Sequence, residues 1–208
     1  MTRRMVMAVA LPVVALGAIA IGSMAGSRSV DRPKKDATSS TTASPASGNA
    51  SALVEFQDEA HGFALSYPKD WMKLESSDPE VVLVVSDRDP SEGRGGSILA
   101  RVVDTGVAIG ADQLAEAKRF TDQVVTADQG VELKAEPTEI NQGGLPGWLY
   151  FYTFTDPARG TKGAHTHYFL FKNTLMISLV FQGLPEDEFI RLAEAKVFDQ
   201  VANSFRLL

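Results

Sequence analysis

Two histidines carry the clearest metal-ligand spacing in this chain. His165 and His167 lie two residues apart in a segment that predicts a β-strand, so both side chains project from one face. That arrangement suits two ligands of a transition metal. His61 is the only other histidine, and Phe169 and Phe171 continue the same face toward a core. The pair is therefore a candidate metal site, with a place in the core as the alternative.

An aromatic stripe is the candidate ligand-binding surface. Trp148, Tyr150 and Tyr152 alternate along a predicted strand and share one face with Phe154. Such a face could line a groove for a ligand. The alternative is that the stripe forms core beneath a helix, where large aromatic side chains usually lie.

Other patterns argue against an enzyme. Asp87-x-Asp89-x-Ser91 begins like a calcium loop, but the required glycine is displaced and Ile98 occupies the twelfth position. The run 94–96 lacks the spacing and lysine of a phosphate-binding loop, and there is no nucleophile elbow. The chain has no cysteine, which excludes disulfides, thiolate metal sites and a catalytic thiol. We expect no catalysis and no cofactor.

Charge is distributed unevenly along the chain. The formal net charge is -6, but residues 1–35 contain six Lys or Arg against one acidic residue. The remaining residues therefore carry a net charge of -11. Phosphate binding needs clustered basic side chains, so we expect no nucleic-acid partner.

The N-terminal segment 1–26 predicts a membrane helix. Arg3 and Arg4 precede an uncharged run over residues 5–25, which as a helix spans roughly 31 Å, close to the thickness of a bilayer core. Basic residues before the run favour a cytoplasmic N-terminus and an exported C-terminal part. The sequence Ser23-Met24-Ala25 also suits signal-peptide cleavage, so a secreted form is the alternative to a single-pass anchor in the cell membrane.

Residues 27–52 predict a disordered linker. The segment is rich in Ser, Thr, Ala and Pro, and Val30 is its only large apolar residue. Such a composition buries too little apolar surface to offset the entropy of ordering. The linker would separate the membrane segment from one domain over residues 53–208.

Alternating and helical patterns in residues 53–208 predict an α+β fold. Two amphipathic segments predict helices at 111–128 and 186–203, and the apolar runs between and before them predict strands. Adjacent strands broken by only two long helices indicate an antiparallel or mixed sheet with helical cover. The expected strands are 63–67, 81–85, 97–103, 131–141, 148–155, 165–172 and 175–182. Pro137 makes 131–141 a candidate for an edge strand or a broken strand.

The opening of this region resembles a known family. Pro68 ends the first strand, and Trp71 can fold back over the strand end. The pattern Gly62-Phe63-x-Leu65-x-Tyr67-Pro68-x-x-Trp71 is similar to the first strand of the Mog1/PsbP-like superfamily. Gly144-x-Pro146-Gly147 before an aromatic strand and the terminal Ser204-Phe205 also resemble that family. The similarity covers about residues 53–208.

The resemblance implies an α/β/α sandwich around an antiparallel sheet. It also implies a non-catalytic role, since members are mostly extrinsic photosystem subunits, a nuclear-transport GTPase partner and bacterial exported lipoproteins. The missing N-terminal cysteine departs from the lipoprotein members and leaves the segment 1–26 as the expected anchor.

These observations lead to two hypotheses of function. The first is a membrane-tethered binding or assembly module, outside the cytoplasm, for a protein partner of the cell envelope. The alternative is an envelope protein that holds a small apolar ligand or lipid between sheet and helix.

Overall fold

The computed structural model describes residues 52–127 and 130–208. Within these residues, eleven strands, three α-helices and two short 3-10 helices form an α+β fold built on antiparallel strand pairs. This confirms the fold class that the sequence predicts. The expected membrane segment 1–26 and all but the last residue of the expected linker lie outside the described residues. No helix in the described part of the chain has the length and apolar character needed to cross a membrane.

A large sheet forms the centre of the domain. Its strands follow the order β3-β4-β5-β10-β9-β8-β6, and β7 also pairs with β8. All of these pairings are antiparallel. The strands are β3 (Met72–Lys73), β4 (Val81–Ser86), β5 (Gly95–Asp104), β6 (Glu132–Leu133), β7 (Thr138–Gln142), β8 (Leu145–Thr155), β9 (Lys162–Lys172) and β10 (Leu175–Leu184).

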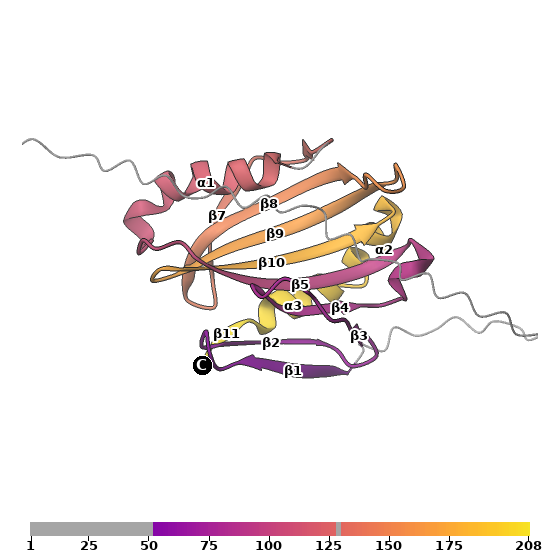
Figure 1. The fold of residues 1–208 in the computed structure, drawn as a ribbon, viewed down its shortest axis with the longest axis horizontal. Helices are drawn as coiled ribbons and strands as arrows, with labels where there is room; N and C mark the ends of the chain where they lie inside the picture. The colour runs from indigo at the N-terminus through magenta and orange to yellow at the C-terminus, as the bar shows by residue number, and fades with distance from the viewer. Residues whose placement is uncertain (1–51, 128–129) are drawn as a thin grey trace, which may run out of the picture.

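A small sheet and the helices cover the large sheet from two sides. The small sheet has the order β1-β2-β11, with β1 (Leu53–Asp58), β2 (Phe63–Pro68) and β11 (Arg206–Leu207). Figure 1 shows α1 on one side of the large sheet and the small sheet on the other. The helices are α1 (Leu114–Thr126), α2 (Glu186–Glu194) and α3 (Val197–Ser204), with 3-10 helices at Pro90–Glu92 and Ala111–Gln113.

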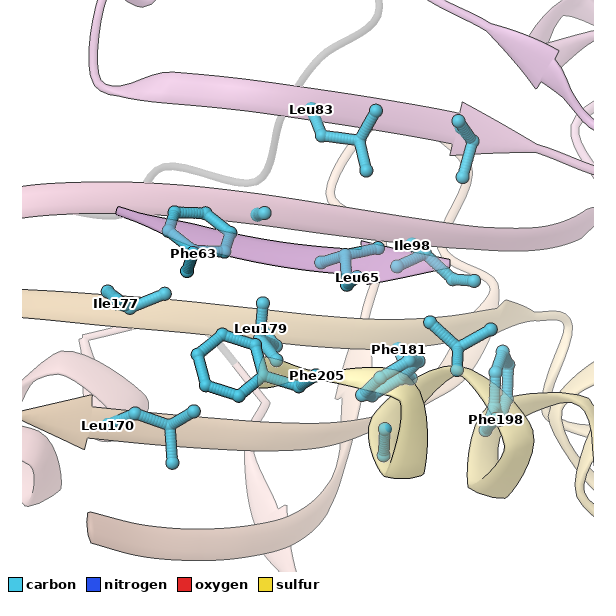
Figure 2. Packing of buried hydrophobic residues seen from close by; sticks show 14 of the residues in the cluster. Phe63, Leu65, Leu83, Ile98, Leu170, Ile177, Leu179, Phe181, Phe198 and Phe205 are labelled. Carbon is cyan, nitrogen blue, oxygen red and sulfur yellow. The ribbon is translucent and has the colours of Figure 1, made fainter. Parts of the chain in front are cut away.

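We call the side of the large sheet that carries α1 the first face. The second face lies against α2, α3 and the small sheet. Figure 2 shows the second-face core, in which Phe63 and Leu65 of β2 approach Ile98, Leu179 and neighbouring apolar side chains. Phe63 also stacks on Phe205 with ring centroids 5.6 Å apart, which joins the two ends of the described domain.

The opening motif, residues 62–71, packs into the second-face core. Trp71 is buried in the same cluster, and its backbone N–H donates to the Pro68 carbonyl at 3.0 Å, as expected for a side chain folded over the strand end. Gly62 has a φ of 68°, a left-handed conformation that glycine adopts readily. Lys172 Nζ donates to the carbonyls of His61 and Gly62 at 2.7 and 2.9 Å. The motif therefore anchors β2 to the hairpin of β9 and β10.

Two predicted elements are divided in the structure. The helix predicted at 186–203 is wrong as a single element, because α2 ends at Glu194 and Lys196 adopts a left-handed φ of 59° before α3. Left-handed backbone cannot continue an α-helix. The strand predicted at 131–141 is two strands, β6 and β7, with Pro137 between them. Proline interrupts strand pairing because it lacks a backbone donor.

The sequence patterns do not predict one of the observed strands, β1. β1 pairs along its whole length with β2, from Leu53 opposite Pro68 to Asp58 opposite Phe63. Most of its side chains are exposed, so the apolar alternation that marks a half-buried strand is weak. The domain therefore contains a strand before the motif that the sequence identifies as its opening.

Candidate functional site

The register of the large sheet brings the predicted site residues together on its first face. Tyr152 lies opposite His165, and Tyr150 lies opposite His167. On the other side of β9, Gln182 lies opposite His165 and Val180 opposite His167. Because residues directly opposite each other in a sheet share a face, these side chains form two neighbouring cross-strand rows.

Trp148 and Tyr150 attach α1 to the sheet. Trp148 Nε1 donates to the Leu114 carbonyl at 2.9 Å. The buried Tyr150 hydroxyl donates to Asp122 Oδ1 at 2.8 Å and lies 2.6 Å from Thr121 Oγ1. Burial raises the pKa of Tyr150, so its hydroxyl stays protonated. Both polar groups are used within the domain, and a ligand-binding role for these two residues stays a prediction.

Tyr152 belongs to a polar network with both histidines. Its hydroxyl lies 3.1 Å from His165 Nδ1 and 3.3 Å from His167 Nδ1. His165 Nε2 lies 2.8 Å from Gln182 Oε1. His167 also stacks on Phe169 with ring centroids 3.8 Å apart. The network joins three strands, β8, β9 and β10, and we call it the Tyr152 network.

The partners of this network fix which ring nitrogens carry protons. Gln182 Oε1 only accepts, so His165 Nε2 must donate and His165 Nδ1 must accept from the Tyr152 hydroxyl. The Tyr152 oxygen then accepts from His167 Nδ1. A neutral imidazole has one N–H, so His167 Nε2 is left with a lone pair.

Both histidines are held neutral. Burial lowers the pKa of His165 to about 4, although its hydrogen bond to Gln182 opposes that change. The pKa of His167 is lowered well below its usual range by burial, and then by the nearby His165 and the Arg101 guanidinium. At neutral pH the Tyr152 network therefore acts through neutral hydrogen bonds.

The metal hypothesis gains no third ligand from the fold. Within residues 52–127 and 130–208, no group of three or more His, Cys, Asp or Glu side chains could hold a metal ion. Both ring nitrogens of His165 already have partners. Metal binding by His165 and His167 stays a prediction, and it would rely on the free Nε2 of His167.

Two buried polar atoms on the first face have no hydrogen-bond partner. They are His167 Nε2 and Ser178 Oγ, on residues with exposed fractions of 2% and 0%. Neither Ser178 nor Gln182 stands out when the sequence is read for site residues. The signal that could have found them is their shared face: two polar residues, four apart, interrupt the apolar strand 175–182 on the side of the histidines.

A separate charged cluster lies between the β4–β5 loop and α2. Glu188 has an exposed fraction of 2%, and its carboxylate accepts from Arg94 Nε at 3.0 Å and from Arg191 Nε at 2.6 Å. Arg191 also bonds Asp87, whose Oδ1 accepts from the Gly96 N–H at 2.6 Å. Burial raises the pKa of Glu188, but the two arginines outweigh that effect and hold it below its usual range. These pairs fix the loop to the helix.

On the second face, the part of the sheet at β8 is only partly covered. Phe151 points away from Tyr150 and Tyr152 and has an exposed fraction of 37%. It stacks on Phe189 of α2 with centroids 5.4 Å apart, and the next residue, Ile190, is 50% exposed. Strand alternation alone does not single out Phe151, because it cannot tell which face of the sheet lacks cover. We call Phe151 with Ile190 the Phe151 patch.

These arrangements suit non-covalent binding. The described candidates offer neutral hydrogen-bonding groups set among apolar side chains, and an exposed aromatic ring beside a helix. Pockets for small molecules and surfaces for protein partners are built from such groups. The histidines are engaged by Tyr152 and Gln182 and do not contact a serine or threonine hydroxyl in any hydrogen bond of the described residues.

Solved structures with the same fold are recognisable despite low sequence identity. LpqN of Mycobacterium tuberculosis, described as involved in cell envelope biogenesis, matches with a TM-score of 0.55 and 16% identity, over 76% of this chain and 92% of that one. Cyanobacterial PsbP (CyanoP) from Synechocystis matches with a TM-score of 0.52 and 18% identity, over 80% and 98%. The Ran-binding protein Mog1p of Saccharomyces cerevisiae matches with a TM-score of 0.50 and 10% identity, over 76% and 96%.

The matches confirm the Mog1/PsbP-like fold that the opening motif indicates. At these identities the likeness establishes the fold alone. Neither a protein-family model nor a curated protein sequence matches the chain.

Proposed function

We propose that this chain is a non-catalytic binding or assembly module that works outside the cytoplasm with a protein partner of the cell envelope. Two of the structural neighbours support the direction of this proposal: one is described by its role in cell envelope biogenesis and another as Ran-binding. The absence of a recognisable catalytic motif in the sequence supports a binding role.

The observation that carries the proposal is the Phe151 patch. Phe151 has an exposed fraction of 37% and stacks on Phe189 of α2, and the next residue of that helix, Ile190, is 50% exposed. Exposed aromatic and aliphatic side chains of this kind typically anchor protein–protein contacts. Single exposed apolar residues are common on protein surfaces, but here Phe151 stacks on Phe189, which directly precedes Ile190 in α2.

The surroundings of the Phe151 patch have the character of an interface rim. The Lys134 backbone N–H donates to the Phe151 carbonyl at 2.9 Å, which brings β6 alongside. Glu132 Oε2 bonds Lys134 Nζ at 2.9 Å and Lys162 Nζ at 3.1 Å, and these three side chains keep their charges paired. An apolar centre with a polar edge is the usual build of a protein interface.

We also propose that residues 1–26 tether the domain to the membrane and that residues 27–52 act as a spacer. The support is the sequence itself: an uncharged run of bilayer length after two arginines, and a following segment poor in apolar residues. Protease treatment of intact spheroplasts tests this topology with a C-terminal epitope. Loss of the epitope from a membrane-bound species is expected, whereas a protected epitope would place the domain in the cytoplasm.

Site-specific photo-crosslinking in intact cells tests the partner proposal. A photoreactive amino acid replaces Phe151 in the full-length chain, and the adducts are resolved by mass and identified by mass spectrometry. We expect one discrete protein adduct from the envelope. The matched control places the same amino acid at Gln123, an exposed position on α1 at the other side of the sheet.

The variant Ile190→Asp tests the same surface quantitatively, through the yield of the adduct. It introduces a charge into the Phe151 patch at an exposed position, so folding should be unchanged while the adduct from position 151 falls by at least about tenfold. Equal adduct yields from positions 151 and 123, or no adduct at position 151, would refute the proposed interface.

A further inference from the structure

The two unpartnered polar atoms on the first face lie on adjacent strands. His167 is opposite Val180, and Ser178 is two residues from Val180 on the same strand and face. Diagonal neighbours of this kind have their Cα atoms about 7–8 Å apart. The His167 ring stacks on Phe169, which is directly opposite Ser178, so the ring leans toward the serine. One small group can bridge the two side chains.

The atoms are also chemically complementary to a hydroxyl group. His167 Nε2 carries a lone pair, because the Tyr152 network places the proton of this ring on Nδ1. Ser178 Oγ can donate or accept. A buried polar atom without a partner carries a desolvation penalty, and native proteins rarely retain one without a use. Two on one face indicate a site that is completed by a bound molecule.

Charge nearby selects a neutral molecule. Arg101 lies opposite Ser178 on β5, and its guanidinium is already paired with Glu80 Oε2, which accepts from Nε at 3.0 Å, and with Asp78 Oδ2 at 3.6 Å. A cationic ligand would meet Arg101, while an anionic one would meet the two carboxylates. An uncharged donor avoids both and also avoids the cost of burying a charge.

An apolar row leads away from His167 across the sheet. Val180, Leu99 and Val84 lie opposite one another on β10, β5 and β4 and share the first face. Val180 and Gln182 are partly exposed, whereas Leu99 and Val84 have exposed fractions of 7% and 6%, so the row reaches the surface at Val180. α1 packs mainly on β8, at the other side of the Tyr152 network. The Val180 end of the row is therefore the apolar approach to His167 for the body of a ligand.

We propose that the first face holds a binding site for a neutral molecule with a hydroxyl group on an apolar body. His167 Nε2 accepts the hydroxyl proton, Ser178 Oγ donates to the hydroxyl oxygen, and the apolar body lies over Val180. We call this the His167 site. It is separate from the Phe151 patch, which lies on the opposite face, so the two proposals fail independently.

Nitrogen NMR of the histidine side chains tests the site in the full-length protein held in an amphipol. At pH 7, before any addition, His167 should show a protonated Nδ1 and an unprotonated Nε2. Titration with 1-octanol as the probe should then shift the His167 Nε2 resonance to saturation, while the resonances of His61, on the β1–β2 turn, stay in place.

Two substitutions assign the response to the named atoms. Ser178→Ala removes a buried hydroxyl that has no partner, and it should weaken 1-octanol binding by about tenfold while leaving the fold intact. His167→Phe keeps a ring to stack on Phe169 and should abolish saturable binding in calorimetry. Ser97→Ala is the matched control, since it removes a hydroxyl from the same face one row away and should leave the affinity unchanged.

Three results would overturn the proposal. A protonated Nε2 on His167 would show that no lone pair is available. A non-saturable response, equal in wild type and Ser178→Ala, would show that the probe acts only as solvent. A saturable response of His167 to Zn²⁺ with none to 1-octanol would assign the site to a metal instead.

Discussion

The two faces of the large sheet are covered in different ways. The second face is packed by α2, α3 and the small sheet, and its cluster contains large apolar side chains from all of these elements. The first face is packed by α1 mainly over β8, and its core continues into the Tyr152 network. The cover is therefore different on the two faces, and each face has a partly exposed residue, Val180 on the first and Phe151 on the second.

The two faces of the large sheet therefore differ in what they contribute to stability and to binding. The second-face cluster contains more buried apolar side chains than the first-face cluster, so its burial should contribute more of the hydrophobic stabilisation. The polar groups of the first face contribute less, since hydrogen bonds to buried tyrosine and histidine replace bonds to water. The partly exposed positions, Val180 on one face and Phe151 on the other, are the places where a bound molecule could add to the cover.

The largest effect is expected in the second-face core. Phe63→Ala should lower the free energy of unfolding by about 3–5 kcal/mol, because Phe63 is fully buried between Phe56 and Phe205 and leaves a cavity. Urea denaturation of the full-length protein measures it. Phe151→Ala is the matched control at the margin and should cost less than about 1 kcal/mol. Equal losses in the free energy of unfolding for the two variants would contradict the difference between the core and its margin.

A smaller effect is expected at Glu188, which fixes the β4–β5 loop to α2. Glu188→Gln should lower the free energy of unfolding by about 1–3 kcal/mol at pH 7, because Arg94 and Arg191 lose a buried charged acceptor. The pKa of Glu188 is depressed in the folded state, so its contribution is present above about pH 4.5 and is lost as pH falls through the folded value. Denaturation at pH 7 and pH 3 measures both, and a difference that persists undiminished at the lower pH would contradict the assignment.

The first face should carry a distinct pH dependence. The pKa of His165 falls from an ordinary 6.5 to about 4 on folding, and that of His167 also falls. The unfolded chain therefore binds protons first, and the free energy of unfolding should decrease as pH falls from 6.5 toward 4. Thermal denaturation across this range should show a shallower decrease for His165→Gln than for wild type. Parallel curves would show that His165 does not titrate in this way.

The smallest loss in the free energy of unfolding is expected at Tyr150, which attaches α1 to the sheet. Tyr150→Phe removes a hydroxyl that bonds Asp122 and Thr121, and it should cost about 0.5–1.5 kcal/mol. Hydrogen exchange should show faster exchange in α1 with little change in β10. Uniform acceleration across the domain would indicate that α1 and the second-face core unfold as one unit.

Much of the fold follows from patterns that are local in the sequence. Alternation in 63–67 and 148–155 identifies β2 and β8, and the apolar stripe after residue 111 identifies α1, because side-chain period directly reflects which positions are buried. The break at Lys196 leaves no such mark: a left-handed residue other than glycine depends on how α2 and α3 pack.

The site is only partly predictable for the same reason. Alternation places Tyr152 on one face of its strand and His165 with His167 on one face of theirs, but it gives no register between the strands. The loop after Asp156 sets that register and brings the three side chains within hydrogen-bond distance. Ser178 enters the site from β10, across a second strand pairing, so its relation to His167 exists only in the folded sheet.

Two adjacent residues of β10 give the most direct test of this division between the faces. Ile177 and Ser178 are both fully buried, but Ile177 lies in the second-face core while Ser178 lies on the first face with an unpartnered hydroxyl. The free energies of unfolding of Ile177→Ala and Ser178→Ala should be measured side by side in the full-length protein. We expect a loss of about 2–5 kcal/mol for Ile177→Ala and no loss for Ser178→Ala. A loss above about 1 kcal/mol for Ser178→Ala would contradict it.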